Sequence, residues 1–180
     1  YLEAASVAKP SSKGDPLWGA MTVMDYEGHV KAVAGGIGEK TRNRGFNCAT
    51  DAVRQPGSTM KPIAVYAPAI EKGLITYSSI LNDTKATYKD WTPKNAGGRF
   101  YGSVTMKYAL AQSLNTVTAR LMEKVGPKSV IDMCRELGIK SDIPASPAIA
   151  LGAVEITVSD MVGAYSTFVN QGVYVKPRFI

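Results

Sequence analysis

The sequence has little of several residue types on which common enzyme classes depend. It contains one histidine, His29, and two cysteines, Cys48 and Cys134, in 180 residues. His29 falls in a predicted strand beside a turn and no Gly-x-Ser-x-Gly pattern occurs, so a Ser-His-Asp hydrolase is disfavoured. The cysteines match no metal-ligand spacing, and we expect neither a metal nor a cofactor. Cys134 is predicted to be a small core residue on the apolar face of a helix, and Cys48 lies in a loop.

Long apolar runs and clusters of basic residues are also missing. No stretch of about 18 apolar residues occurs, so nothing in the sequence predicts a membrane span. The formal net charge is +6, but Lys and Arg are dispersed and no nucleic-acid motif is present. We interpret the charge as a solvated surface and expect no nucleic-acid partner. The 45% of hydrophobic residues is ordinary for a globular domain with a sizeable core.

The predicted elements run from strands, through helices, back toward extended chain. Residues 1–16 are expected to form a polar linker ahead of a domain at 17–180. Ala20 to Asp25 and His29 to Ala34 predict an antiparallel hairpin, and 82–102 predicts an irregular stretch. Ala148 to Ala153 is an apolar run that fits a core loop or a short strand, and Val173 to Val175 begins another extended segment. Helices are predicted at 58–72, 106–112, 116–125, 127–137 and after the capping box Thr157-Val158-Ser159-Asp160.

This order of elements predicts the fold class. An α/β fold of the α+β type, in which an antiparallel sheet is split around a helical subdomain, accounts for it. A lone hairpin is marginally stable, so further strands are expected after Ile180. The apolar residues of the last helix predict its buried face: Met161, Ala164, Tyr165 and Phe168.

Ser58 and Lys61 are the strongest candidates for chemistry. Three residues apart at a predicted helix start, they share one face, so the amine can take the proton that the hydroxyl must lose to become a nucleophile. Free N–H groups at the helix start suit a developing oxyanion. A second Ser-x-x-Lys begins at Ser6, but it precedes a polar linker with no apolar face. The Pro56-Gly57 turn and the amphipathic helix beyond it favour Ser58.

Ser113 and Asn115 form a second pattern, Ser-Leu-Asn, between two predicted helices. A short turn there can present both side chains to a cleft, where Ser113 can relay a proton and Asn115 can bind a substrate amide. By itself Asn115 is more simply explained as a cap of the helix that begins at Thr116. Beside the preceding Ser-x-x-Lys, the catalytic interpretation is stronger.

Ser-x-x-Lys followed by Ser-x-Asn resembles the motif pair of penicillin-binding proteins and serine β-lactamases. The run from Arg54 to Pro62 is similar to the nucleophile segment of bifunctional, class A penicillin-binding proteins. The run from Val104 to Thr116 is similar to their second motif, and Thr92-Pro93-Lys94-Asn95 with Tyr101-Gly102 to the segment between. The tail from Gly163 to Tyr174 also matches.

The resemblance implies a serine β-lactamase/penicillin-binding-protein transpeptidase fold and a D,D-transpeptidase. Ser58, Lys61 and Ser113 would be catalytic and Asn115 substrate-binding. Peptidoglycan stem peptides ending in D-Ala-D-Ala and β-lactam antibiotics would be the partners. The enzyme would work at the extracytoplasmic face of a bacterial membrane, anchored by parts absent from this sequence.

One family motif, Lys-Thr-Gly on a later strand, is absent. Lys40-Thr41-Arg42 lacks the glycine and precedes Ser58. The family's strand supplies an oxyanion N–H and carboxylate-binding groups, so we expect this stretch to be the first part of a transpeptidase domain, with an incomplete site. Three alternatives stay open. A β-lactamase would resemble the chain less, because Leu rather than Asp stands at position 114. A D,D-carboxypeptidase differs only in its acceptor, and a sensor would bind penicillin or peptidoglycan without turnover.

Overall fold

A computed structural model describes residues 18–38, 43–88 and 91–179. The expected linker, Ser6 and Lys40-Thr41 lie outside these residues. The chain divides into two compact units. The first takes the described parts of Tyr1–Arg54, Glu136–Ser141 and Glu155–Ile180, and the second takes those of Gln55–Arg135 and Asp142–Val154. Among the described residues, no helix is both long and apolar enough to cross a membrane.

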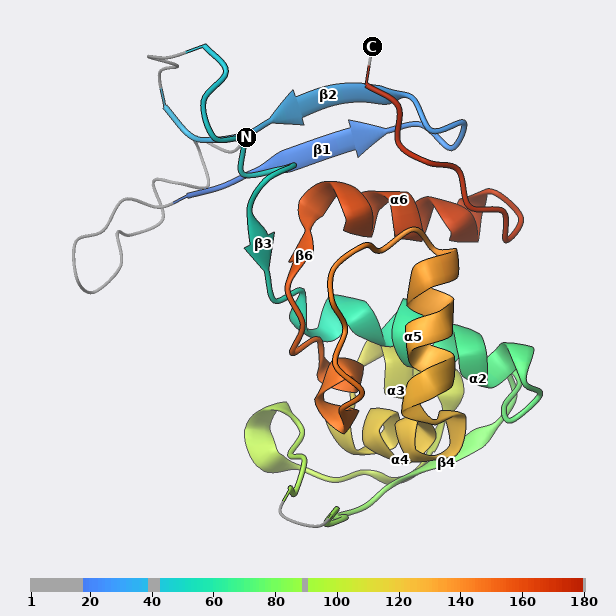
Figure 1. The fold of residues 1–180 in the computed structure, drawn as a ribbon. Helices are drawn as coiled ribbons and strands as arrows, with labels where there is room; N and C mark the ends of the chain where they lie inside the picture. The colour runs from blue at the N-terminus through green and yellow to red at the C-terminus, as the bar shows by residue number, and fades with distance from the viewer. Residues whose placement is uncertain (1–17, 39–42, 89–90, 180) are drawn as a thin grey trace, which may run out of the picture. The chain divides into compact units, whose positions relative to one another are not determined.

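The first unit is built on the predicted hairpin. Strands β1 (Met21–Met24) and β2 (Val30–Ala34) pair antiparallel, with Met21 opposite Ala34 and an irregularity at Val23/Met24. Gly28 in the turn has φ +89°, and a Cβ there would lie 2.6 Å from Val175 Cγ1. Only glycine meets both conditions. Helix α6 (Val158–Val169) lies along the hairpin, as Figure 1 shows.

A short second pairing leads into α6. Strand β6 (Ile156–Thr157) pairs antiparallel with β3 (Val53–Arg54). The predicted cap of α6 is confirmed, because Thr157 Oγ1 accepts a hydrogen bond of 3.0 Å from the Asp160 N–H. The predicted extended segment at Val173 to Val175 forms no strand. The bridge to the hairpin comes later, where the Val30 N–H donates to the Arg178 carbonyl.

The predicted buried face of α6 is right for Ala164 and wrong for Tyr165 and Phe168. Phe168 is 51% exposed and Tyr165 is also exposed, while their rings stack edge to face with centroids 5.7 Å apart. The buried residues of the helix are mostly small: Ser159, Gly163, Ala164, Ser166 and Thr167. Small side chains let the backbone approach its neighbours closely, and the buried hydroxyls of Ser159 and Ser166 donate to carbonyl groups.

The second unit begins with the helix predicted at 58–72, which consists of three segments of different helix type. A 3₁₀ turn η1 (Gly57–Thr59) leads into a π turn η2 (Pro62–Tyr66) and then α2 (Ala67–Glu71). Pro62 and Pro68 have no N–H, so neither can donate an α-helical bond to the preceding turn. Met60, Ile63 and Ala64 are buried, whereas Ile70 is 46% exposed.

Strands β4 (Ile80–Asp83) and β5 (Gly102–Thr105) pair antiparallel at the two ends of the predicted irregular stretch, 82–102. A turn η3 (Ala96–Gly98) lies between them. Helices α3 (Met106–Ala111), α4 (Asn115–Val125) and α5 (Pro127–Glu136) match their predictions within a few residues.

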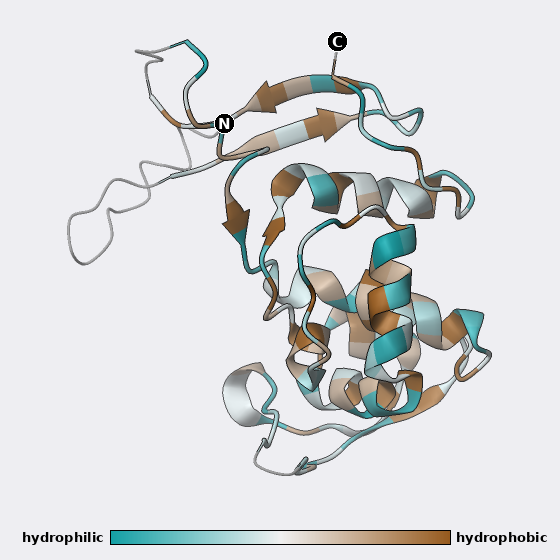
Figure 2. Ribbon diagram, in the orientation of Figure 1, coloured by the Kyte–Doolittle hydropathy of each residue, from teal (hydrophilic) through white to brown (hydrophobic). Residues whose placement is uncertain are grey.

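The apolar run near 150 is a 3₁₀ helix, η4 (Pro147–Leu151), rather than a loop or strand. Apolar and polar residues alternate around α5 (Figure 2), whose Cys134 is fully buried as predicted. Cys48, in the first unit, is half-buried. The core of the second unit lies among η2, α4, α5 and η4, and includes Ile63, Val65, Val117, Met122, Val130 and Ile149.

Candidate active site

Ser58 lies in η1 and is exposed. The turn before it is held by the Thr59 hydroxyl, which donates to the Pro56 carbonyl at 2.7 Å. Gly57 has φ +57°, a conformation that side chains disfavour. The Pro-Gly turn therefore presents Ser58 at the tip of the helical segment.

Gly152 supports this turn from η4. Its φ is +75°, and a Cβ there would overlap the backbone of Gly57, including its carbonyl group. Glycine is required at position 152 both by conformation and by space. The apolar run around Gly152 gave no sequence signal for this contact with Gly57.

Lys61, one turn beyond Ser58, is 1% exposed. Its Nζ donates to the Ser113 carbonyl at 2.6 Å, to Ser113 Oγ at 2.9 Å and to Asn115 Oδ1 at 2.6 Å. Burial disfavours the ammonium and lowers the pKa of Lys61 to about 8. The residue thus has a neutral fraction at physiological pH, which a proton acceptor needs.

Ser113 adopts a left-handed conformation, with φ +52°. It ends α3 in a Schellman motif, since the Ser113 N–H donates to the Leu110 carbonyl and the Leu114 N–H to the Ala109 carbonyl. Glycine is the usual residue at this position, and a serine there is strained. In this left-handed conformation, both the carbonyl and the hydroxyl of Ser113 face Lys61. Residues held in strained backbone conformations often lie at functional sites.

Asn115 is the first residue of α4 and does not cap it. Its Oδ1 accepts from Lys61, and its Nδ2 donates to the Lys94 carbonyl at 2.7 Å. The structure therefore brings Lys61, Ser113 and Asn115 into direct contact. Ser58 lies on the same helical segment, and among the described residues no hydrogen bond joins its hydroxyl to Lys61.

Comparison with known proteins identifies the family. The family model described as the penicillin binding protein transpeptidase domain matches residues 19–180. The chain belongs to this family. The predicted resemblance is confirmed, and the match places the chain in a family of peptidoglycan transpeptidases.

Relatives of this transpeptidase domain are class A penicillin-binding proteins. Penicillin-binding protein 1A of Aquifex aeolicus is 38% identical over 91% of the chain and 23% of its own length. The protein of the same name from Neisseria flavescens is 39% identical over 99% of the chain and 24% of its own length. The chain thus spans about a quarter of the length of these curated relatives.

Solved structures confirm the transpeptidase fold. The crystal structure of penicillin-binding protein 1A from Haemophilus influenzae matches with a TM-score of 0.80 and 32% identity, over 91% of this chain and 25% of that one. PonA1 from Mycobacterium tuberculosis in complex with penicillin V matches with a TM-score of 0.78 and 31% identity, over 91% of this chain and 46% of that one.

Proposed function

We propose that the protein is a D,D-transpeptidase that cross-links peptidoglycan stem peptides through an acyl-enzyme on Ser58. The observation that carries this proposal is the setting of Lys61. It is a buried amine with a pKa of about 8, held by Ser113 and Asn115 one helical turn from an exposed serine. A lysine on the surface would be almost fully protonated at neutral pH and a poor base.

In the proposed acylation, Ser58 Oγ attacks the carbonyl carbon between the two terminal D-alanines. The hydroxyl proton passes to Lys61 as the C–O bond forms, and N–H groups at the start of the helical segment stabilise the oxyanion. The C–N bond then breaks. The leaving amine of D-alanine takes a proton from Lys61 through the Ser113 hydroxyl, while Asn115 binds the peptide amide.

Transfer reverses these steps with a new partner. An amine from a neighbouring stem peptide attacks the acyl carbon and gives up a proton, Ser58 Oγ leaves, and the serine regains its hydrogen. A β-lactam would acylate the same serine, because its strained amide stands in for the D-Ala-D-Ala bond. We propose the extracytoplasmic face of a bacterial membrane as the place of action, since the substrate is cell-wall peptide.

The test is to locate the covalent adduct. Treatment of the intact protein with a penicillin, followed by mass spectrometry of its peptides, should place the adduct on Ser58, and Ser58→Ala should remove it. An adduct elsewhere, on Ser6 for example, or one undiminished in Ser58→Ala, would refute the proposed nucleophile.

Turnover of a stem-peptide thioester distinguishes the remaining functions. Transfer to an added D-amino acid supports a transpeptidase, whereas release to water alone indicates a carboxypeptidase. A stable adduct without turnover of the thioester indicates a sensor.

A further inference from the structure

Asp83, at the end of β4, is a fully buried acidic side chain that the proposed mechanism does not use. Burying a carboxylate is costly unless hydrogen bonds compensate it. Its oxygens accept from Asn95 Nδ2 at 2.8 and 3.1 Å, from the Tyr101 N–H at 2.9 Å and from the Thr116 hydroxyl. Asp83 is the acceptor in every one of these contacts, so the pocket around it suits a carboxylate.

Asn95 connects this carboxylate to α4. Its Nδ2 also donates to the Arg99 carbonyl at 2.9 Å, so both of its hydrogens are used. Its Oδ1 accepts from the Asn115 N–H at 2.8 Å. The first N–H groups of a helix have no partner within it, and the side chain of Leu114, at the cap position, cannot supply one. Asn95, 20 residues earlier, caps α4 instead.

Asn115 completes the connection to Lys61. The Asn95 side chain binds its backbone, and the neighbouring Lys94 carbonyl binds its Nδ2. With the N–H₂ group of Asn115 held in this way, Oδ1 is left facing the Lys61 amine at 2.6 Å. Hydrogen bonds therefore lead from Asp83 through Asn95 and Asn115 to Lys61, all within the second unit.

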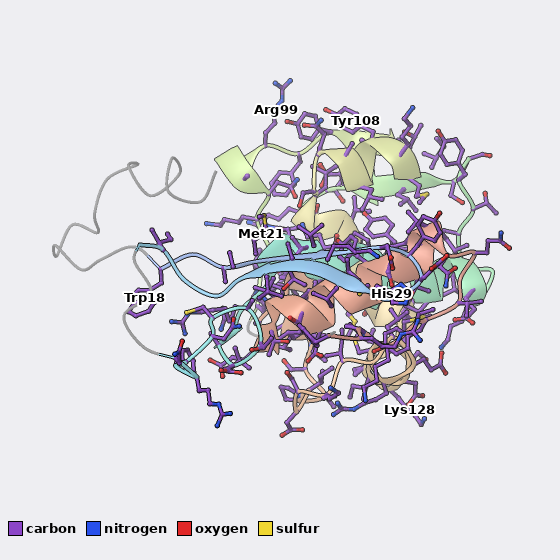
Figure 3. The ribbon with its side chains drawn as sticks, turned by 90° about the horizontal axis from the view of Figure 1, so that it is seen from above. Trp18, Met21, His29, Arg99, Tyr108 and Lys128 are labelled. Atoms are coloured by element: carbon purple, nitrogen blue, oxygen red, sulfur yellow. The ribbon has the colours of Figure 1, made fainter. Side chains whose placement is uncertain are left out.

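The loop between Asn95 and β5 is also held from outside. The Arg99 guanidinium lies 5.3 Å from the Tyr101 ring centroid, and that ring packs edge to face on Tyr108. Figure 3 shows Arg99 and Tyr108 at the outer surface of the unit. On its inner side, the same loop is held by Asp83, which accepts hydrogen bonds from Asn95 and from the Tyr101 N–H.

We propose that Asp83 is a positioning residue that holds Asn115 against Lys61. It acts through Asn95 and Thr116, whose donor groups converge on its carboxylate, and its negative charge also suits the N-terminal end of α4. The proposal rests on the proposed function insofar as the position of Lys61 matters for acylating Ser58.

Asp83→Asn tests this in the intact protein. It replaces one carboxylate oxygen by an N–H₂ group, which opposes the Asn95 N–H₂ donor in either orientation and the Tyr101 N–H as well in one of them. We expect acylation of Ser58 by penicillin to slow by about tenfold or more, which is about 1.4 kcal/mol of barrier.

A second readout does not depend on acylation. NMR titration of the side-chain carbon beside the Lys61 amine, assigned with Lys61→Arg, measures its pKa directly. In Asp83→Asn this pKa should fall below that of the wild type. The ammonium loses one of its acceptors while the residue stays buried.

Val130→Ala is the matched control, because Val130 is equally buried in the same unit and its apolar side chain makes none of the hydrogen bonds that link Asp83 to Lys61. It should lower the thermal midpoint without moving either readout. Thr116→Val removes one donor to Asp83 at nearly constant volume and should slow acylation by about threefold. It carries the test if Asp83→Asn does not fold.

An unchanged acylation rate and an unchanged Lys61 pKa in the folded Asp83 or Thr116 variant would overturn the proposal, as would equal changes in Val130→Ala. A wild-type protein that is not acylated at Ser58 would instead refute the proposed function. The titration of Lys61 would still decide whether Asp83 positions it.

Discussion

Two aspartates stand at the ends of strands in this molecule, and their surroundings differ sharply. Asp25 follows β1 in the first unit, is partly exposed, and accepts from Lys31 Nζ at 3.0 Å and from the His29 N–H at 2.8 Å. Asp83 ends β4 in the second unit and is fully buried among neutral donors. Water can replace the partners of Asp25 but not those of Asp83, so only the buried carboxylate can fix the geometry of its neighbours.

The surroundings of Asp25 and the network that begins at Asp83 shift pKa values for different reasons. Burial acts to raise the pKa of the Asp25 carboxyl, but hydrogen bonds from Lys31 and His29 outweigh it and hold this pKa below its usual range. The network that begins at Asp83 instead ends at a buried lysine, whose pKa burial lowers. The exposed cluster favours charged groups, whereas the buried one favours a neutral amine where a base is needed.

The largest effect on the acylation rate is expected at Lys61, where the buried network ends one helical turn from Ser58. Lys61→Arg keeps a cation of similar length, but a guanidinium does not lose its proton in the working pH range. Acylation by penicillin should fall by about a thousandfold, within the range for loss of a general base. Stopped-flow or mass-spectrometric rates measure this. A rate within about tenfold of wild type would remove Lys61 from the mechanism.

The pH dependence of acylation should follow the same lysine. Its ordinary pKa is about 10.4, and burial lowers it to about 8, so the neutral amine forms as pH rises through 8. Below that value the rate should fall by about tenfold per pH unit, since the neutral fraction does. A rate profile that is flat from pH 6 to 9 would contradict a lysine base.

Gly152→Ala should slow acylation less than Lys61→Arg does. It should lower the stability of the fold more than a substitution at the surface does. The new methyl group meets the backbone of Gly57, so the turn that presents Ser58 must shift. Gly73→Ala is the control, because Gly73 also has positive φ and has open space around it. The control isolates the conformational cost of about 1 kcal/mol. Denaturation of both variants should show a greater loss for Gly152→Ala, together with slower acylation.

Much of the fold could be predicted because its signals are local. The hairpin at Gly28, the helices and the Thr157 cap of α6 follow from turn residues, apolar spacing and capping patterns within a few residues of one another. The Ser58–Lys61 pair is of the same kind. The family motifs also brought Ser113 and Asn115 together with it, and the contacts of Lys61 agree with that grouping.

The remainder depends on partners distant in sequence. The sequence of strand β4, Ile-Leu-Asn-Asp, does not alternate between apolar and polar residues, and the apolar Ile80 is exposed while Asp83 is buried. Pairing with β5 makes it a strand. Likewise, the left-handed Ser113 and the close approach of Gly152 to Gly57 appear only in three dimensions. Two residues of the predicted α6 face were wrong, because apolar spacing identifies Tyr165 and Phe168, whereas the helix buries mostly small residues such as Gly163 and Ser166.

The smallest effect on stability and on acylation is expected at Asp25, which is partly exposed beside His29 and Lys31. Asp25→Asn keeps an oxygen that can accept from the His29 N–H and loses the ion pair with Lys31, a kind of contact that is weak and screened by salt. At neutral pH its thermal midpoint should fall less than that of Val130→Ala, and acylation should not change.

The pH dependence of this small effect has a definite sign. A carboxyl whose pKa is lowered by folding stabilises the folded state above its unfolded pKa of about 3.9, and this stabilisation is lost as pH falls. The difference between wild type and Asp25→Asn should therefore shrink on acidification, as thermal scans across pH 3 to 7 can measure. If Asp25→Asn destabilised the protein as much as Asp83→Asn does, burial would not be what separates the two aspartates.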